Sequence, residues 1–459
     1  MRNRASILVG LLWCLALLAL VVVGVLHTAR MDLLTGKNFS DNIQAHYLAL
    51  AGIEKAKALL YKNASERSRS GKNHTGEFYD NAQQFREVEF GRGTYSVIRR
   101  GRQDEGGGVI YGISDEESRL NVNTAEADAL QKISGIGVEA ASAIRGWRGQ
   151  GNTVVETEYY LSQRPPCKPR GGPFQTIREL LMVRGVSSDL LLGQDAHQNG
   201  LLDAMDDGNG GSTKFQSSIS TSDLGWAGAL TVDSAVKNVN AAGESRVNVQ
   251  SADESALSAV HGITREIARD IVAYRGQHQL QSIVDLLDVT PPQNNNNNGN
   301  RNSQGSRNRQ NGNSNNNSAP DAGSGSSGQK VISSDLFAEI ADDVTVASDE
   351  TISGVVNVNT ASAEVLVCLP GIDRELAQAI ISYRSSSGFF GNVASVLKVD
   401  GMASQIFKQL VPLVTVRAET FRILGEGRVK STGATQRIQE IVRINLDGVK
   451  TLSYREDNL

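Results

Sequence analysis

A chain of 459 residues is too long for one typical domain, so we expect two or three domains. The formal net charge is −4 and 21% of the residues are charged, which argues against a general nucleic-acid-binding protein. The three scattered cysteines form neither a disulfide framework nor a metal cluster, although Cys167 and Cys368 could pair in an oxidising compartment.

The first element is the apolar run Ile7–Leu26, which is long enough to cross a hydrocarbon core of about 30 Å as a helix. Arg2 and Arg4 precede it, and this positive flank predicts a cytoplasmic N-terminus with the rest of the chain across the membrane. Apolar residues continue at mostly helical spacings to Leu60. We therefore predict one helix over residues 6–62, with its first half in lipid and an amphipathic second half.

The sequence Arg4-Ala5-Ser6, directly before the apolar run, resembles a type IV prepilin N-terminus. In that family, prepilin peptidase cuts between a short basic leader and the membrane helix. The resemblance implies that residues 1–5 form a leader, that the chain is cleaved between Ala5 and Ser6, and that Ser6 is N-methylated. The family usually has Gly where this chain has Ala5. An ordinary signal anchor is the alternative interpretation.

Most pilins carry Glu at the mature position that is Gly10 in this chain. The missing Glu, together with the later segment Gln44–Glu54, resembles the minor pseudopilin K (GspK) family of type II secretion systems. That family combines a long N-terminal helix with a small sheet that is interrupted by a large helical domain.

Strand patterns lie on both sides of the middle of the chain. Residues 63–75 are polar and predict a loop, and Phe78–Ile113 predicts short strands. Near the end, Glu419–Gly425 and Ile438–Asn445 again predict strands, followed by a turn at Asp447-Gly448. We expect the late strands to pair with the early ones. The predicted fold class is therefore α+β, with an all-α domain inserted between the strands of a small antiparallel sheet.

A repeat in three copies fills the inserted domain. Each copy has an Asn-Thr-Ala-like start, then Gly-Ile, then an aromatic residue and Arg. The Gly stands 12 residues after Asn123, Gln250 or Asn359, and the Arg stands 13 residues after that Gly in every copy. The copies begin at Leu120, Val247 and Val356, their glycines are Gly135, Gly262 and Gly371, and their arginines are Arg148, Arg275 and Arg384.

Each copy predicts two short helices joined by a tight turn at the Gly, where a positive φ is inexpensive. The hydroxyls of Thr124, Ser251 and Thr360 are predicted to cap the first helices. The expected buried residues are Leu130, Leu257 and Leu366 on the first helices, and Ala141, Ile144, Ala268, Ile271, Ala377 and Ile380 on the second. A second hairpin signature follows at 174–181, 280–287 and 390–397. The pattern resembles the helix-hairpin-helix, or SAM-like, module.

Helix-hairpin-helix modules often bind the DNA backbone through turn amides and a helix N-terminus, so DNA binding is a rival interpretation. Gly135-Ile136-Gly137 resembles the DNA-binding form, whereas Thr264 and Asp373 replace the last Gly in the other copies. Asp373 would place a carboxylate where a phosphate should bind. We therefore expect a structural scaffold and no nucleic-acid partner, with a competence-type DNA-uptake protein as the alternative.

The expected domain boundaries follow from these patterns. The first part of the sheet is predicted over 63–119, the helical domain over 120–410 and the last part of the sheet over 411–459. Within the helical domain, the repeats are expected over 120–192, 247–290 and 356–410. Loops are expected at 150–173 and 193–240, and the Asn-rich segment 293–329 has too few apolar residues to order and predicts a disordered loop.

No catalytic signature involves the six histidines, so we expect no enzymatic activity. One loop has the spacing of an EF-hand-like calcium site. Its candidate ligands fall at loop positions 1, 5, 7, 9 and 12, namely Asp195, Asn199, the Leu201 carbonyl, Asp203 and Asp206. Members of the K family bind calcium in the helical domain. The alternative is a solvated acidic loop.

The resemblance to the K family implies a minor pseudopilin that caps the tip of the periplasmic pseudopilus and helps to initiate its assembly for protein export. It implies I-type and J-type minor pseudopilins, the major pseudopilin, prepilin peptidase and the inner membrane as partners. The chain would cross the bacterial inner membrane once, with a cytoplasmic N-terminus and a periplasmic bulk. The alternatives are an envelope-anchored DNA-binding protein and a membrane-anchored scaffold outside secretion.

Overall fold

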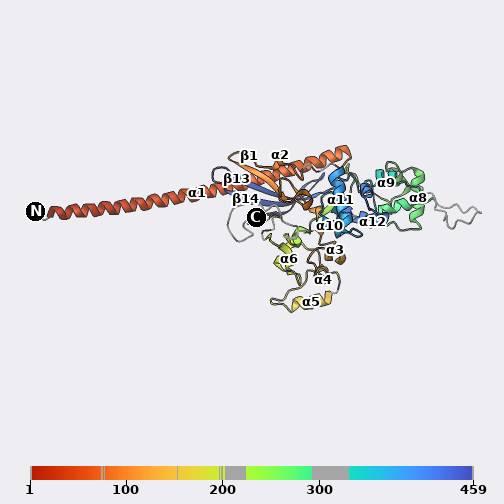
Figure 1. Cartoon of the computed structure of the whole chain (residues 1–459), viewed down its shortest axis with the longest axis horizontal. Coiled ribbons are helices and arrows are strands. Elements are labelled where there is room, and N and C mark those ends of the chain that lie inside the picture. The colour runs from red at the N-terminus through yellow and green to blue at the C-terminus, as the bar shows by residue number, and fades with distance from the viewer. Residues whose placement is uncertain are drawn as a thin grey trace, which may run out of the picture.

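The structure is a computed structural model, which describes residues 3–73, 76, 78–151, 153–195, 197, 200, 201, 224–291 and 330–456. The side chains of residues 3–7 and 153–156 lie outside this description. A single helix, α1 (Asn3–Ser70), projects from a body that contains one large sheet and three groups of short helices (Figure 1).

The large sheet joins strands from both ends of the chain. Its order is β1-β2-β13-β14-β15, and β3 and β4 pair with β2 and β13. All of these pairings are antiparallel, and Leu424–Val429 of β13 lies opposite Gly93–Ile98 of β2. The predicted pairing of late strands with early ones is therefore confirmed. The strands are β1 (Val88–Phe90), β2 (Gly93–Arg100), β3 (Val109–Ile110), β4 (Ser114–Asp115), β13 (Thr420–Val429), β14 (Thr435–Asn445) and β15 (Gly448–Arg455).

The second half of α1 packs on this sheet. Ala49, Ile53 and Ala56 of the helix are fully buried, in one cluster with Val97 of β2 and Ile423 of β13. A short helix, α2 (Ala82–Phe85), adds the buried Phe85 to the same cluster. The amphipathic half of the predicted helix therefore supplies the core of the sheet domain.

Helix α1 is longer than the prediction of 6–62, and the predicted loop at 63–75 was wrong for its first part, because the helix continues to Ser70. Three tertiary contacts hold this polar last part. Ala64 is buried, Arg67 faces Glu419 at 3.9 Å, and the Ser68 hydroxyl donates to the Ala242 carbonyl at 2.7 Å. These partners are distant in sequence, so helical periodicity alone did not reveal them.

The repeats form three modules that share one architecture. Module one covers 120–231, module two 247–345 and module three 356–415. In each module the first and last two-residue strands pair in parallel, which closes the module on itself. These pairs are β5 (Leu120–Asn121) with β6 (Leu230–Thr231), β8 (Val247–Asn248) with β9 (Val344–Thr345), and β11 (Val356–Asn357) with β12 (Val414–Thr415).

Short helices fill each module between its paired strands. Module one contains α3 (Ala127–Gln131), α4 (Val138–Trp147), α5 (Thr153–Leu161), η3 (Ile177–Met182), α6 (Ser188–Leu192) and η5 (Trp226–Gly228). Module two contains α7 (Glu254–Ser258), α8 (Arg265–Arg275), η6 (Ile283–Asp288) and α9 (Ser334–Ile340). Module three contains α10 (Ala363–Val367), α11 (Arg374–Ser387), η7 (Val393–Lys398), α12 (Ser404–Leu410) and η8 (Val411–Leu413).

The predicted core of the repeats is confirmed. The structure buries all nine side chains completely, namely Leu130, Leu257, Leu366, Ala141, Ile144, Ala268, Ile271, Ala377 and Ile380. The turn glycines Gly135, Gly262 and Gly371 adopt φ of 85°, 86° and 74°, as a left-handed turn requires.

The predicted caps were wrong. The first helices of the modules have their N-caps two residues later, at Glu126, Asp253 and Ser362, and the latter two accept a backbone N–H through the side chain. The reason is a turn just before the helix, in which the Asn side chain of the repeat accepts the backbone N–H two residues on. These bonds measure 2.9–3.0 Å and join Asn121 to Asn123, Asn248 to Gln250, and Asn357 to Asn359.

Two of the predicted loops contain regular structure. In 150–173, residues Thr153–Leu161 form α5, because Tyr160 is buried and its ring packs edge-on against Trp147 at 5.1 Å. In 193–240, η5, β6 and β7 (Ala235–Lys237) form, since β6 closes module one and β7 pairs with β10 (Thr351–Ser353). The Asn-rich segment 293–329 lies outside the described residues.

Candidate functional site

The first half of α1 is exposed along its whole described length. The large apolar side chains from Leu8 to Leu34 are each at least 45% exposed, and this is the described helix that is long and apolar enough to cross a membrane. Apart from its chain neighbours and the backbone of its own helix, Gly10 has no described atom within 4 Å of its β-carbon position. Ala5 and Ser6 lie in the first turns of α1, and nothing of their side chains is described.

The three hairpin turns differ at the N-terminus of the helix that follows. In module three the Asp373 carboxylate accepts the Leu376 N–H at 2.8 Å, and in module two the Thr264 hydroxyl accepts the Ile267 N–H at 3.3 Å. In module one the corresponding residue is Gly137, which has no capping side chain. In two of the three modules a side chain of this protein therefore caps the N-terminus of the second helix. In module three the capping group is a carboxylate.

The repeated arginines bind the module's own backbone. Arg148 donates to the carbonyls of Val122 and Ala125, and Arg384 donates to those of Val358 and Ala361. In module two, Arg275 donates to the Val249 carbonyl at 2.8 Å. These guanidinium groups join the second helix of each module to the segment that follows its first strand. The spacing that made the repeat recognisable therefore serves folding.

The second polar residue of each repeat start also faces inward. The side-chain oxygens of Asn123, Gln250 and Asn359 accept the N–H of Phe174, Leu280 and Phe390 at 2.7–2.9 Å. These bonds tie the first hairpin of each module to the second. Neither the repeated amides nor the repeated arginines are thus presented to a ligand.

A buried acidic segment joins the sheet to modules one and three. Asp115 is the last residue of β4, and its carboxylate accepts hydrogen bonds from Asn357, Thr360 and Tyr79. The two carboxyl oxygens of Glu117, in η2 (Glu116–Ser118), accept the N–H groups of Ala235 and Thr420. Burial and the neighbouring Asp115 carboxylate hold the pKa of Glu117 well above its usual range.

The middle residue of this segment, Glu116, is also fully buried but has cationic partners. Its carboxylate accepts from Arg422 of β13 at 2.7 Å and from Arg119 at 3.2 Å. It also accepts the Thr231 hydroxyl of module one. Burial opposes its ionisation, but the two arginines outweigh that effect and lower the pKa of Glu116.

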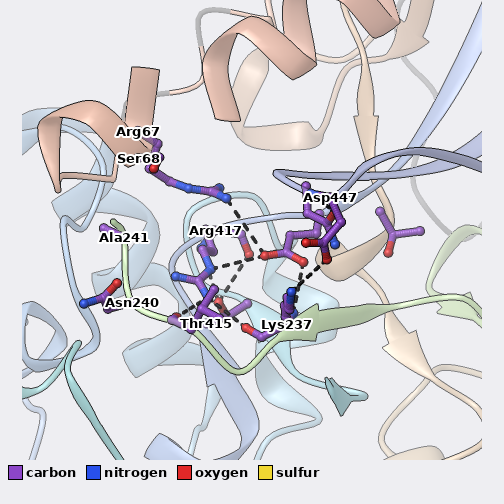
Figure 2. A network of polar contacts seen from close by, with 12 residues as sticks. Arg67, Ser68, Lys237, Asn240, Ala241, Thr415, Arg417 and Asp447 are labelled. Carbon is purple, nitrogen blue, oxygen red and sulfur yellow. Dashed lines mark hydrogen bonds and ion pairs between the residues drawn. The ribbon is translucent and has the colours of Figure 1, made fainter. Parts of the chain in front are cut away.

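A second junction joins α1, the segment between module three and β13, and the end of β7, and Figure 2 shows Arg67 pointing from the helix toward it. Glu419 lies between Arg67 and Arg417, and it also accepts the Lys237 N–H at 3.0 Å. Arg417 donates to the carbonyls of Lys237 and Val239. Its burial, beside Arg246 and Arg67, lowers the pKa of Arg417 to about 10. The helical modules are therefore fixed to the sheet through buried charged groups.

Neither junction was predicted. Asp115, Glu116 and Glu117 form an acidic run of a kind common in exposed loops, and Arg417 and Glu419 form no motif. The available signal was an acidic run that ends directly before the first repeat. Only the tertiary structure shows that these charges meet partners more than one hundred residues away.

The predicted calcium ligands are partly described. Asp195 is buried and its carboxylate accepts the Gly200 N–H at 2.9 Å, as in a turn that would begin such a loop. Leu201 is buried against Ile98 and Leu424 of the sheet. The other predicted ligands, Asn199, Asp203 and Asp206, lie outside the described residues. In the described part of the chain, the cysteines Cys167 and Cys368 are free thiols.

The family comparison bears on the repeats. The model of the helix-hairpin-helix motif matches residues 243–291 and 352–415. Two segments of this chain are helix-hairpin-helix motifs. The first contains the part of module two from β8 to η6, and the second contains module three. Module one has the same paired strands, turn glycine and inward arginine. The structure thus extends the helix-hairpin-helix architecture to all three repeats.

Two curated relatives match over 73 residues, which is 16% of this chain. ComE operon protein 1 of Bacillus subtilis is 34% identical, and an uncharacterized protein of Neisseria meningitidis, NMA0194, is 33% identical. The matched region spans 36% and 10% of their lengths.

One solved structure matches most of the chain. It is a chain of the crystal structure of the GspK–GspI–GspJ complex from the type 2 secretion system of enterotoxigenic Escherichia coli. The match covers 91% of this chain and 98% of the other, at 10% sequence identity and a TM-score of 0.38.

Proposed function

We propose that this chain is a minor pseudopilin of the K type, which caps the tip of a type II secretion pseudopilus and has a structural, not an enzymatic, role. The observation that carries the proposal is helix α1. It begins at a prepilin-like leader, exposes an apolar first half and continues without a break into the core of an antiparallel sheet.

The absence of a carboxylate at Gly10 places this subunit at the tip of the filament. In pilin-like assemblies the Glu at this mature position neutralises the N-terminal amine of a neighbouring subunit. A buried, unpaired ammonium costs several kcal/mol, on the order of 3–5 after relaxation. Gly10 has no carboxylate, so this chain cannot support a subunit above it but can sit above others. I-type and J-type minor pseudopilins and the major pseudopilin are the proposed neighbours.

The shape of the body supports the same position. In the sequence, modules one to three lie between β4 and β13, two strands that pair in the sheet. The Asp115 and Arg417 junctions join the modules to that sheet. A broad body that is rigidly attached to the filament helix suits an end of the filament better than its shaft. This chain would cross the inner membrane once, with its body in the periplasm.

DNA binding remains the second candidate, because helix-hairpin-helix motifs are present and Gly135-Ile136-Gly137 has the uncapped turn. The Asp373 cap and the inward-facing arginines argue against it. Salt-dependent binding of duplex DNA by the full-length protein at near-physiological ionic strength would favour this second function.

The experiment that tests the proposed function is the intact mass of the protein after extraction from the membrane. Prepilin processing predicts a chain that begins at Ser6 and carries one N-terminal methyl group. A chain that begins at Met1, or that is cut near Ala29, would contradict the pseudopilin role and favour an ordinary anchor or signal peptide.

A further inference from the structure

Module one carries an insertion that the other two modules lack. Residues 150–173 separate α4 from η3, and they contain α5 and a Pro-rich loop. Figure 1 shows α5 at the end of module one that points away from the sheet. Insertions in repeat proteins commonly build the binding face.

Tyr160 ties the insertion to the second hairpin of module one. Its hydroxyl accepts the Arg184 N–H at 2.8 Å, and its carbonyl accepts the Cys167 N–H at 3.1 Å. The end of α5, the Pro-rich loop and the second hairpin turn are thereby held side by side. We call this surface the module-one platform, and it consists of Tyr159, Leu161, Arg164, Lys168, Met182 and Arg184.

The platform exposes apolar side chains. Leu161 is 46% exposed and Met182 is 55% exposed. The positions equivalent to Met182, one residue before the buried Val of each second turn, are Asp288 in module two and Lys398 in module three, and both are exposed. The repeat therefore has a charged residue at this solvent-facing position in two modules and an apolar one in module one.

The platform is also cationic. Residues 158–184 contain five Arg or Lys and two carboxylates, in a chain whose net charge is −4. One of those carboxylates, Glu179, is bound by Arg170 at 3.1 Å and by the Trp147 indole at 3.0 Å. Arg184 lies over the Tyr159 ring at 5.3 Å, which orients a cation beside an aromatic surface.

We propose that the module-one platform docks an acidic segment of a partner protein that carries an apolar anchor residue. Arg, Tyr and Met are enriched in protein interfaces, where an aromatic or aliphatic anchor supplies most of the binding energy. The positive platform complements acidic side chains around such an anchor. A DNA backbone would be contacted by cations and amides and would leave Leu161 and Met182 in water. This inference does not depend on the pseudopilin role.

The test uses the full-length protein in detergent micelles and fluorescein-labelled peptides made of Glu, Asp and Leu, read by fluorescence anisotropy. The proposal predicts saturable binding that weakens when Leu is replaced by Ser, and loss of binding when Glu and Asp are replaced by Lys. Leu161→Ser with Met182→Asp should weaken binding about tenfold or more, as should Arg164→Ser with Lys168→Ser.

The matched control is Arg265→Ser with Arg374→Ser, which removes two exposed cations from modules two and three and should leave affinity unchanged. Thermal melting of each variant verifies folding. Absence of peptide binding, or equal loss in the control, would overturn the proposal. Binding of duplex DNA that is lost with Arg164→Ser and Lys168→Ser but is insensitive to Leu161→Ser and Met182→Asp would also overturn it, in favour of a nucleic-acid partner.

Discussion

Gly427 of β13 lies directly against the backbone of Ala45 in α1. A β-carbon at residue 427 would stand 2.0 Å from the Ala45 carbonyl oxygen and 2.5 Å from the Ala49 amide nitrogen. Gly425, two residues earlier on the same face of the strand, is similarly close to the Ala49 carbonyl oxygen, at 2.6 Å. Helix α1 therefore packs on β13 through close contact between the two backbones.

Gly427→Ala should therefore separate α1 from β13 and destabilise the protein by about 1–3 kcal/mol, as overpacking does in other cores. A lower melting temperature of the full-length protein in detergent is the expected result. Gly391→Ala is the control, because its β-carbon would meet no atom within 4 Å. Equal melting temperatures of the two variants would contradict the close packing of α1 on β13.

Arg384 and Arg275 occupy the same position of the repeat but should contribute differently to stability. Arg384 is 4% exposed, binds two backbone carbonyls and also donates to Asp104 of the sheet domain at 2.8 Å. Its replacement by Met should cost about 3 kcal/mol, since it leaves several buried acceptors unpaired.

Arg275→Met should cost about 1 kcal/mol, because Arg275 is only half-buried and donates to one carbonyl, that of Val249. Chemical denaturation of both variants measures the difference. A larger loss of stability in Arg275→Met than in Arg384→Met would contradict the connection that Arg384 makes between module three and the sheet domain.

The sequence predicted the repeats well because each module is built from contacts that are close along the chain. Asn123 belongs to the turn before the first helix, Gly135 to the hairpin turn, and Arg148 binds the backbone of the same module. Their spacing is therefore set within one module. The same offsets predicted the buried Leu130 and Ile144 correctly. Periodicity likewise predicted that α1 is one helix.

What the sequence could not predict depends on partners from distant segments. The end of α1 at Ser70 depends on Glu419 and Ala242, and the burial of Asp115 depends on Asn357 and Thr360. The helix caps were predicted two residues too early because the hydroxyl of Thr124 could itself cap a helix. In the structure the Asn121 side chain forms a turn before the helix, so the N-cap is Glu126. In the platform, Met182 is an apolar residue whose exposure only the structure reveals.

The buried Glu117 predicts a dependence of stability on pH. Its pKa is raised in the folded state, so the folded protein retains a proton that the unfolded chain releases above the usual glutamate pKa of about 4.3. The stability due to this proton is complete below that pKa and is lost as pH rises toward the folded-state pKa.

Glu117→Gln removes this titration, so the stability of the variant relative to the native protein should increase as pH rises from about 4 to 8. Urea denaturation across that range measures it. The matched control is Glu158→Gln, which makes the same substitution at an exposed position outside this junction. Parallel stability curves for Glu117→Gln and the native chain would contradict a retained proton at this junction.

We also propose calcium binding at the loop that begins at Asp195. Calcium should raise the melting temperature of the full-length protein, since a ligand that binds only the folded state stabilises it. Asp195→Ala with Asp203→Ala should abolish this increase. An unchanged increase in the double variant would place the ion elsewhere, and no increase in the native protein would exclude a calcium-stabilised fold.

We propose that the missing carboxylate at Gly10 confines this subunit to one end of a pseudopilus. Immunogold labelling of pseudopili that contain the native chain tests this position. We predict label at one end of each filament, and label along the shaft in the Gly10→Glu variant if the carboxylate decides position. Regular labelling along the shaft with the native chain would contradict the capping role.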